Sequence, residues 1–272
     1  MTLRTIVMVV VVGALAGCLA DQTGVVEGEV RGRRLVATTL PASAANETNL
    51  ANAFRQEGLR YVGGEGAKQD AEGWAERPVV FEVQHPFDLK LTDRWSYDTA
   101  TDVQDIWVLG SDKAHLPPPN RTTARTELRL IDPEYLPGTG LHKMECDLFI
   151  VPGTWACITQ VFARGPMAMI GVDAEGTITD LRTRAVIGKG MNGRWFHWTV
   201  VHDSGAAGKG AIQIYVDGKL VDGEVSANRS ASYYFKVGVY SRHGSERSEV
   251  KVRNLRVWWR DVATTMTGNG HG

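Results

Sequence analysis

Stretches in which apolar and polar residues alternate dominate the chain from about residue 74 onward. In a β-strand, successive side chains point to opposite faces, so this alternation predicts strands with one buried face. Residues 233–242, YYFKVGVYSR, show the pattern clearly. One face of this strand is apolar and consists of Phe235, Val237 and Val239. The other face carries two phenols, an ammonium group and a gap, formed by Tyr234, Lys236, Gly238 and Tyr240. Such a polar face makes the strand a candidate for a binding site.

Ten such stretches are predicted to be strands: 79–84, 105–109, 125–131, 142–150, 155–163, 167–172, 195–202, 211–217, 233–241 and 249–260. Turn signals separate them, including Pro-Gly-Thr-Gly at 137–140 and Asp-Gly at 217–218. Helical periodicity is almost absent. Many short strands joined by regular turns favour a single all-β domain, a β-sandwich or jelly roll, over residues 76–262.

The first residues have the layout of a secretory signal. MTLRTIVMVVVVGALAGC contains one basic residue, Arg4, followed by an apolar run that is too short to span a membrane. Its end, Leu-Ala-Gly-Cys, resembles a bacterial lipobox, in which Cys18 is acylated and becomes the mature N-terminus. The alternative is an ordinary signal peptide and a secreted protein. We expect residues 1–17 to be removed and the protein to be exported to the cell envelope, with the lipid anchor as its only membrane contact.

The segments on either side of the predicted sandwich show little pattern. Residues 18–75 lack sustained alternation and end in the Gly-rich stretch GGEGAKQDAEG. This composition predicts a tether that is partly disordered, with one short helix near residues 49–58. Residues 263–272 are predicted to be a flexible tail.

The overall charge gives no sign of a nucleic-acid partner or of an anionic membrane surface. The 272 residues are 43% hydrophobic and 22% charged, and the formal net charge is -1. Because a nearly neutral chain has no global field that would attract nucleic acid, we expect no such partner. An acidic ligand would have to be held by a local cluster of Arg and Lys. No cofactor motif or metal-ligand spacing is present, so we expect neither group, and we expect a monomer.

Two cysteines remain in the predicted domain. Cys146 and Cys157 flank Val-Pro-Gly-Thr at 151–154, which predicts a hairpin turn. Strands paired across such a turn would bring the two thiols close together, and an oxidising compartment would allow a disulfide. The alternative is a pair of buried thiols.

Two further predicted strands carry a polar face. In RTELRL, Arg125, Glu127 and Arg129 share one face, and the Glu can hold an Arg through a charge-assisted pair. In ITQVF, the amide of Gln160 offers donors and an acceptor. Taken singly, each strand is more simply a solvated surface. If the three polar faces lie side by side in one sheet, however, they form a groove.

Within such a groove the side chains would have distinct roles. Arg125 and Gln160 could bind a carboxylate, because a guanidinium and an amide both donate hydrogen bonds. Tyr240 could give or take a proton. Gly238 would leave room for a backbone or a sugar to approach.

These three strands resemble the signature strands of polysaccharide lyase family 7, the alginate lyases. RTELR, Gln-Val-Phe and YFKVGVY occur in the order and approximate spacing of that family, and the resemblance covers roughly residues 75–262. It implies a concanavalin A-like jelly roll with a concave substrate cleft. It also implies β-elimination on a uronate polymer, in which the enzyme neutralises the C6 carboxylate, removes the C5 proton and protonates the leaving oxygen.

The resemblance assigns roles residue by residue. Arg125 and Gln160 would bind the substrate carboxylate. Tyr240 would be the catalytic acid, and in one option also the base. The substrate-binding residues expected beside them are Arg129, Lys236, Tyr234, Glu127 and Arg242.

The sequence departs from the family pattern at two places. Phe162 stands where the family has a His that helps to neutralise the carboxylate, and Ser241-Arg242 replaces the usual Asn-Gln. Three outcomes stay open. Tyr240 acts as both base and acid, a loop histidine such as His115 or His142 replaces the missing one, or the site binds without cutting. Because glucuronan lyases of related fold carry their His on another strand, glucuronan is an alternative substrate to alginate.

Two other functions compete with the lyase. A hydrolase on the same fold needs carboxylates in the pattern E-x-D-x-x-E, of which only Glu145 and Asp147 are present. A carbohydrate-binding, lectin-like lipoprotein could stack sugars on its tryptophans, although most of these are more simply core residues. The predicted function is a polysaccharide lyase that cleaves an alginate-like polyuronate, with the lectin-like protein or a glucuronan-type lyase as alternatives.

Overall fold

The structure is a computed structural model that describes residues 24–30, 33–39, 59–62, 72–77, 79–119, 122–132, 134–205, 209–227, 232–242 and 246–260. The chain divides into two units, Met1–Glu57 and Gly58–Gly272. In the first unit, β1 (Gly24–Val30) and β2 (Arg33–Thr39) form an antiparallel pair. Four sequence predictions lie outside the described residues: the signal over 1–17, the acylated Cys18, the helix near 49–58 and the tail over 263–272.

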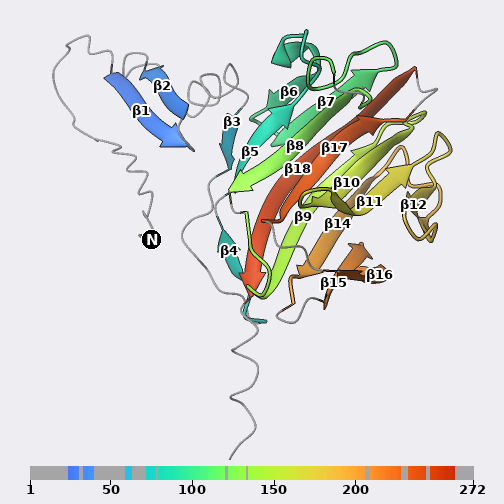
Figure 1. Ribbon diagram of the computed structural model, residues 1–272. Coiled ribbons are helices and arrows are strands. Elements are labelled where there is room, and N and C mark those ends of the chain that lie inside the picture. The colour runs from blue at the N-terminus through green and yellow to red at the C-terminus, as the bar shows by residue number, and fades with distance from the viewer. Residues whose placement is uncertain are drawn as a thin grey trace, which may run out of the picture. The chain divides into compact units, whose positions relative to one another are not determined.

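One antiparallel sheet of eight strands, which we call the β17 sheet, carries the predicted site (Figure 1). Its strands, in spatial order, are β13 (Val186–Gly188), β12 (Ile178–Asp180), β11 (Pro166–Val172), β10 (Ala156–Phe162), β17 (Tyr234–Ser241), β8 (Arg125–Asp132), β5 (Val79–Gln84) and β3 (Leu59–Val62). The three strands with polar faces, β10, β17 and β8, are therefore neighbours at the centre of this sheet.

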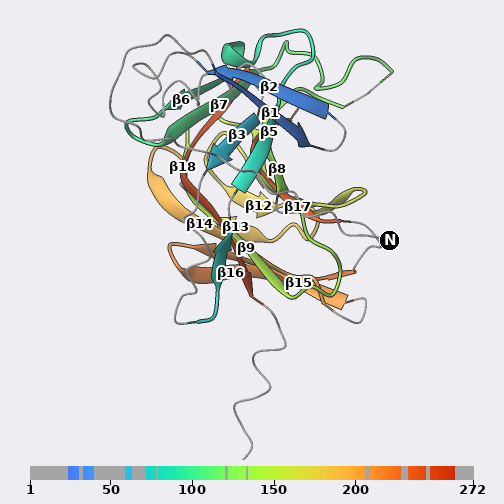
Figure 2. The same cartoon turned by 90° about the vertical axis from the view of Figure 1, so that its left-hand side faces the viewer.

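The second antiparallel sheet, which we call the β18 sheet, forms the other layer of the sandwich (Figure 2). Its strands, in spatial order, are β16 (Lys219–Ala227), β15 (Lys209–Val216), β14 (Trp195–Asp203), β9 (Leu141–Ile150), β18 (Arg247–Arg260), β7 (Val103–Leu109) and β6 (Trp95–Asp98), and β4 (Ala75–Arg77) also pairs with β18. The short 3-10 helix η1 spans Leu91–Asp93. No helix in the described part of the chain is long and apolar enough to cross a membrane.

The hydrophobic core lies between the two sheets, as the alternation predicts. On β17, the apolar set is at most 1% exposed and consists of Phe235, Val237 and Val239. On β9, the facing set is fully buried and consists of Met144, Cys146, Leu148 and Ile150. Burial of these side chains, worth about 1.5–3 kcal/mol each, holds the sheets together and turns the polar residues of both sheets outward. The predicted all-β sandwich of the jelly-roll class is confirmed.

Each of the ten predicted strands is present, with ends shifted by at most two residues. The prediction missed the short strands β3, β4, β6, β12 and β13, and also β16. A run of three or four residues is too short to show alternation, and KLVDGEVSA in β16 is too polar. Strand β3 pairs with β5, so the sheet begins upstream of residue 76, inside the segment predicted to be a tether. Strands β1 and β2 also fall in that segment.

The predicted hairpin between the two cysteines is wrong. The chain leaves β9 in the β18 sheet, turns at residues 151–155 and enters β10 in the β17 sheet, so these strands do not pair. Cys146 and Cys157 are therefore free and buried, and the proposed disulfide is not formed. Burial raises the pKa of both thiols well above the ordinary value, so they behave as small apolar side chains.

Candidate functional site

The predicted site residues come together on β10, β17 and β8. Gln160 lies opposite Lys236, and Lys236 lies opposite Arg129. Four residues further along β17, on the same face, Tyr240 lies opposite Arg125. Residues directly opposite on neighbouring strands share a face, so these side chains form one contiguous polar surface. The spatial convergence expected from the sequence is found in the structure.

A fourth strand, β5, extends this surface and was not predicted as part of it. Gln84 pairs with Glu127, and Glu82 pairs with Arg129. The signal was present in the sequence, because Glu82 and Gln84 alternate with apolar residues in VVFEVQ. It was missed because none of the signature stretches extends to this strand.

Glu127 is the hub of the surface. Its carboxylate is 1% exposed and accepts a short hydrogen bond from the amide nitrogen of Gln160. Its other oxygen, Oε2, lies 3.3 Å from Lys236 Nζ and 3.4 Å from an Arg125 guanidinium nitrogen. A buried carboxylate requires such partners, because an unpaired charge in the interior is costly. Glu127 therefore fixes the positions of the other three side chains.

Gly238 is required where β17 passes β8. Its φ is +146°, and a Cβ added there would lie 2.5 Å from the Thr126 carbonyl oxygen and 2.8 Å from the Glu127 Cα. Gly238 pairs with Glu127 and leaves the position above it without a side chain. The space expected there from the sequence thus serves a close approach of the neighbouring backbone.

We expect Gly238→Ala to lower the free energy of unfolding by about 3 kcal/mol, because it combines an unfavourable φ with a backbone clash. The measurement is urea unfolding followed by tryptophan fluorescence. Gly153→Ala is the matched control: φ is +86° and nothing lies within 4 Å of an added Cβ. It should cost only the conformational strain, about 1–2 kcal/mol. Equal losses in the two variants would contradict the assigned close approach.

Arg125 and Tyr240 lie against each other at one end of the surface. The Arg125 guanidinium carbon lies 4.1 Å from the centre of the Tyr240 ring, and the Arg125 side chain is 12% exposed. Its Nε is buried without a hydrogen-bond partner among the described residues. The Tyr240 hydroxyl likewise makes no hydrogen bond to another described residue. A positioned guanidinium with spare donors is suited to a carboxylate ligand.

Lys236 and Gln160 are more deeply buried than the sequence suggested. Each is 2% exposed. Lys236 Nζ donates to Gln84 at 2.7 Å, and burial lowers the pKa of Lys236 despite the opposing effect of Glu127. The Gln160 amide nitrogen donates one of its two hydrogens to Glu127, which leaves the second for another acceptor. Both side chains therefore hold Glu127 in place, and Gln160 has one further amide hydrogen.

Arg129 lies at the other end of the surface and is already neutralised. Its guanidinium is 3.4 Å from Glu82 and 3.1 Å from Glu134, and its carbon lies 4.5 Å from the ring centre of Tyr234. Burial raises the pKa of Tyr234. With two carboxylates on one guanidinium, this end attracts an anion less strongly than the Arg125 end.

Phe162 occupies the strand position that a titratable residue would need to join the cluster. Its ring centre is 5.1 Å from Lys236 Nζ and 5.4 Å from the Tyr234 ring centre. It shields the ammonium group from water and can neither accept nor donate a proton.

The structure distinguishes the two histidines considered as substitutes. His142 is fully buried in the core, stacked on Tyr135 with ring centres 3.8 Å apart, and burial lowers its pKa to about 3. It lies in the core between the two sheets and not on the polar face that carries the site. His115, in contrast, is partly exposed and lies in the electrostatic neighbourhood of Glu82, Arg125 and Lys236.

Arg242 follows β17 and lies beside an exposed tryptophan. Its guanidinium carbon is 5.7 Å from the ring centre of Trp155, which is 36% exposed. Its backbone nitrogen donates to the Trp155 carbonyl oxygen at 3.2 Å. Arg242 comes two residues after Tyr240, which places it near one end of the surface.

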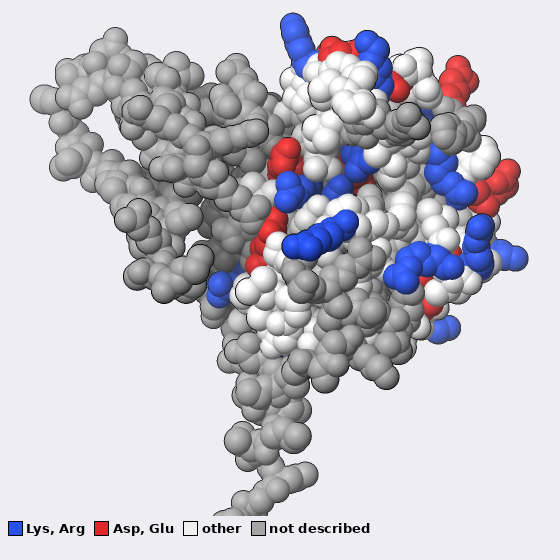
Figure 3. Space-filling view, in the orientation of Figure 1, with Lys and Arg blue, Asp and Glu red and all other residues white. Residues whose placement is uncertain are grey.

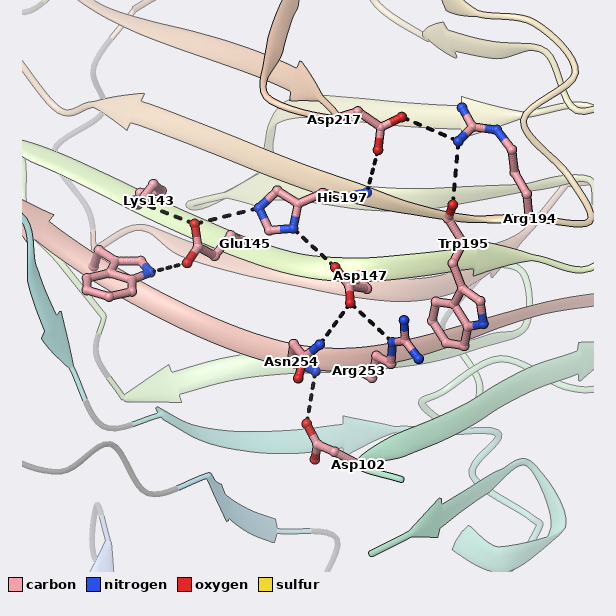
Figure 4. A network of polar contacts seen from close by, with 11 residues as sticks. Asp102, Lys143, Glu145, Asp147, Arg194, Trp195, His197, Asp217, Arg253 and Asn254 are labelled. Carbon is pink, nitrogen blue, oxygen red and sulfur yellow. Dashed lines mark hydrogen bonds and ion pairs between the residues drawn. The ribbon is translucent and has the colours of Figure 1, made fainter. Parts of the chain in front are cut away.

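The carboxylates of the rival hydrolase lie on the other sheet. Glu145 and Asp147 project from β9 into a network on the outer face of the β18 sheet (Figure 4). His197 bridges them, at 3.8 Å from Glu145 and 3.2 Å from Asp147, and Asp147 also accepts from Arg253 at 3.1 Å. Both carboxylates are engaged in ion pairs and are remote from the Arg125 cluster, which gives the hydrolase no support.

One face of the molecule carries charges of both signs. On the face shown in Figure 3, Lys and Arg side chains stand beside Asp and Glu. The described residues on this face form no broad patch of one sign. On this face no broad field of one sign would attract a charged ligand, so an acidic ligand would need a local cluster of Lys and Arg.

The amino-acid sequence is similar to that of a binding protein. No family model matches the sequence. A citrate-binding protein of Hevea brasiliensis is 28% identical over 212 residues, which are 74% of this chain and 84% of that protein.

A solved structure of a polysaccharide lyase shares the fold. An alginate lyase of polysaccharide lyase family 7 superposes with a TM-score of 0.51 at 17% identity, over 65% of this chain and 93% of its own. An alginate lyase from Pseudomonas aeruginosa gives 0.48 at 19%, over 62% and 86%. An endo-β-1,4-glucuronan lyase from the fungus Trichoderma reesei gives 0.46 at 12%, over 73% and 94%. At these identities the first match establishes the fold alone.

Proposed function

We propose that this protein, which has the jelly-roll fold of polysaccharide lyase family 7, cleaves a uronate-containing polysaccharide by β-elimination. The observation that carries the proposal is the Arg125–Tyr240 pair. A guanidinium with an unused buried donor lies 4.1 Å from the ring of a tyrosine whose hydroxyl bonds no described residue. One group can hold a carboxylate and the other can transfer a proton to the neighbouring carbon–oxygen bond.

The charge balance of the cluster supports an anionic ligand. Arg125 and Lys236 carry two positive charges and Glu127 one negative charge, so the group has a net charge of +1. A uronate carboxylate would bring it to zero. Because Glu127 and Lys236 are almost completely buried, water screens this attraction less than it would on an open surface.

The same arrangement favours the chemistry. Removal of the proton at C5 of a uronate builds negative charge on the C6 carboxylate, and Arg125 already faces that charge before the reaction begins. Gln160 can donate its remaining amide hydrogen to the second carboxylate oxygen. Tyr240, beside Arg125, can deliver a proton to the leaving glycosidic oxygen. The protein thus lowers the energy of the enolate-like transition state more than that of the bound ground state.

The test is a screen of the purified protein against polymannuronate, polyguluronate and glucuronan. We expect the ultraviolet absorbance of an unsaturated uronate to rise with at least one polymer. Arg125→Ala should weaken retention of that polymer by about 10–100-fold, because a charge-assisted hydrogen bond is lost, and should also slow cleavage. No absorbance rise on any of the three polymers would refute the lyase proposal.

A second candidate function is carboxylate binding without cleavage. Two observations favour it: Phe162 cannot transfer a proton, and a relative at 28% identity is a citrate-binding protein. In this case the cluster around Arg125 would hold a carboxylate of citrate or of an acidic saccharide. Calorimetric binding of citrate or of a uronate oligomer, without formation of unsaturated product, would identify this function.

A further inference from the structure

His115 is held beside the site in a defined tautomer. Its Nδ1 lies 3.0 Å from the His85 carbonyl oxygen, and the backbone nitrogen of Phe87 donates to the Ala114 carbonyl at 3.1 Å. Because a carbonyl oxygen can only accept a hydrogen bond, Nδ1 carries the proton. The lone pair is therefore on Nε2, which makes no hydrogen bond to any described residue.

The sheet order places His115 on the opposite side of Arg125 from Tyr240. Tyr240 is on β17, Arg125 is on β8, and His85, which holds His115, directly follows β5. Strand β8 lies between the other two. A carboxylate held by Arg125 would therefore have a phenol on one side and an imidazole on the other.

The surroundings of His115 favour a neutral base. Burial lowers its pKa below the ordinary 6.5, and the positive charges of Arg125 and Lys236 act in the same direction. Glu82 and the His85 carbonyl act in the opposite direction. At neutral pH, Nε2 is thus unprotonated and able to accept a proton.

We propose that His115 is the base that removes the C5 proton and that Tyr240 is the acid. This inference rests on the proposed lyase function and deepens it. Groups on opposite sides of the carboxylate suit a uronate whose C5 proton and C4 oxygen lie on opposite faces of the ring. α-Linked L-guluronate has this arrangement, whereas β-linked D-mannuronate does not, so the substrate class is a guluronate-type polymer.

The bonds of the reaction balance without a cofactor. His115 Nε2 takes the proton from C5, and the electron pair of that C–H bond forms the C4–C5 double bond. The bond from C4 to the glycosidic oxygen breaks, and this oxygen takes the proton of the Tyr240 hydroxyl. The products are an unsaturated uronate and a new reducing end. Exchange with water then returns a proton to Tyr240 and removes one from His115.

His115→Gln tests the assignment, because an amide keeps polarity but cannot act as a base. We expect cleavage of polyguluronate to fall by about 100-fold or more, with retention of the polymer unchanged. The acidic limb of the pH–rate profile, which reports loss of the neutral imidazole, should disappear from the residual activity. His197→Gln, on the outer face of the β18 sheet, is the control and should match the wild type.

The outcomes distinguish this inference from the proposed function. If the wild-type protein cleaves no polymer, the lyase function and the role of His115 both fail. If it cleaves polyguluronate and His115→Gln does so equally fast with the same pH profile, only the role of His115 fails. Cleavage confined to polymannuronate would also overturn the inference, because Tyr240 alone can then serve both steps.

Discussion

Replacing Tyr240 by Phe is expected to abolish cleavage while leaving polysaccharide binding almost intact. The substitution removes only the hydroxyl, so the ring that lies 4.1 Å from the Arg125 guanidinium stays in place. Without the phenol, no positioned acid can protonate the leaving oxygen, and the turnover rate should fall by about 1000-fold. The rate is measured by ultraviolet absorbance of the unsaturated product, and binding by affinity electrophoresis in gels that contain the polymer.

Tyr215→Phe is the matched control for this prediction. Its hydroxyl donates to Gln213 at 3.2 Å on β15 of the other sheet, so its loss should leave both rate and retention unchanged. Full activity in Tyr240→Phe would exclude the tyrosine as the acid. A loss of retention as large as the loss of rate would show that the hydroxyl serves binding rather than chemistry.

Alternation along the chain was sufficient to predict the faces of the central strands. Phe235 and Leu128 are buried, and Tyr240 and Arg125 lie on the opposite face, because a strand has only two sides. That β10, β17 and β8 are neighbours was predicted only through the resemblance to known signature strands. Periodicity assigns a side chain to a face and contains no information on which strands pair.

Features that depend on distant parts of the chain could not be predicted. The chemistry of Val-Pro-Gly-Thr at 151–154 fits a hairpin and also fits a connection between sheets, so it could not decide whether Cys146 lies near Cys157. The partnership of Gln84 with Lys236 joins positions 152 residues apart. The same holds for His115, whose proximity to Arg125 arises from the sheet order and the loop that follows β7.

Phe162 changes what the cluster can do. With a titratable side chain in place of Phe162, strand β10 could both bind a carboxylate and transfer a proton. Here the β10 strand provides only an amide, from Gln160, and an apolar cap over Lys236. Any proton transfer must therefore come from β17 or from the β5 side of the site. Tyr240 and His115 are the residues proposed for these transfers. The polymer screen separates a lyase from a binding protein, because only a lyase forms the unsaturated product.

Replacing Glu127 by Gln should cause the largest loss of stability on this surface. The carboxylate is 1% exposed and accepts from Gln160, Lys236 and Arg125. A neutral amide would leave the 3% exposed ammonium of Lys236 without a counter-charge and would turn an N–H₂ group toward other donors. We expect the free energy of unfolding to fall by about 3–5 kcal/mol, measured by urea denaturation at neutral pH.

Two further variants make this prediction specific to the buried charge. Glu82→Gln removes a carboxylate that is 36% exposed and pairs with Arg129 on the same surface, so it should cost no more than about 1 kcal/mol. The double variant Glu127→Gln with Lys236→Met removes both buried charges and should recover part of the loss, because the cost of Glu127→Gln arises mainly from the unpaired ammonium. If the free energy of unfolding of Glu127→Gln is within about 1 kcal/mol of the wild-type value, Glu127 is not the hub that orders Arg125. The carboxylate-binding geometry would then lose its support.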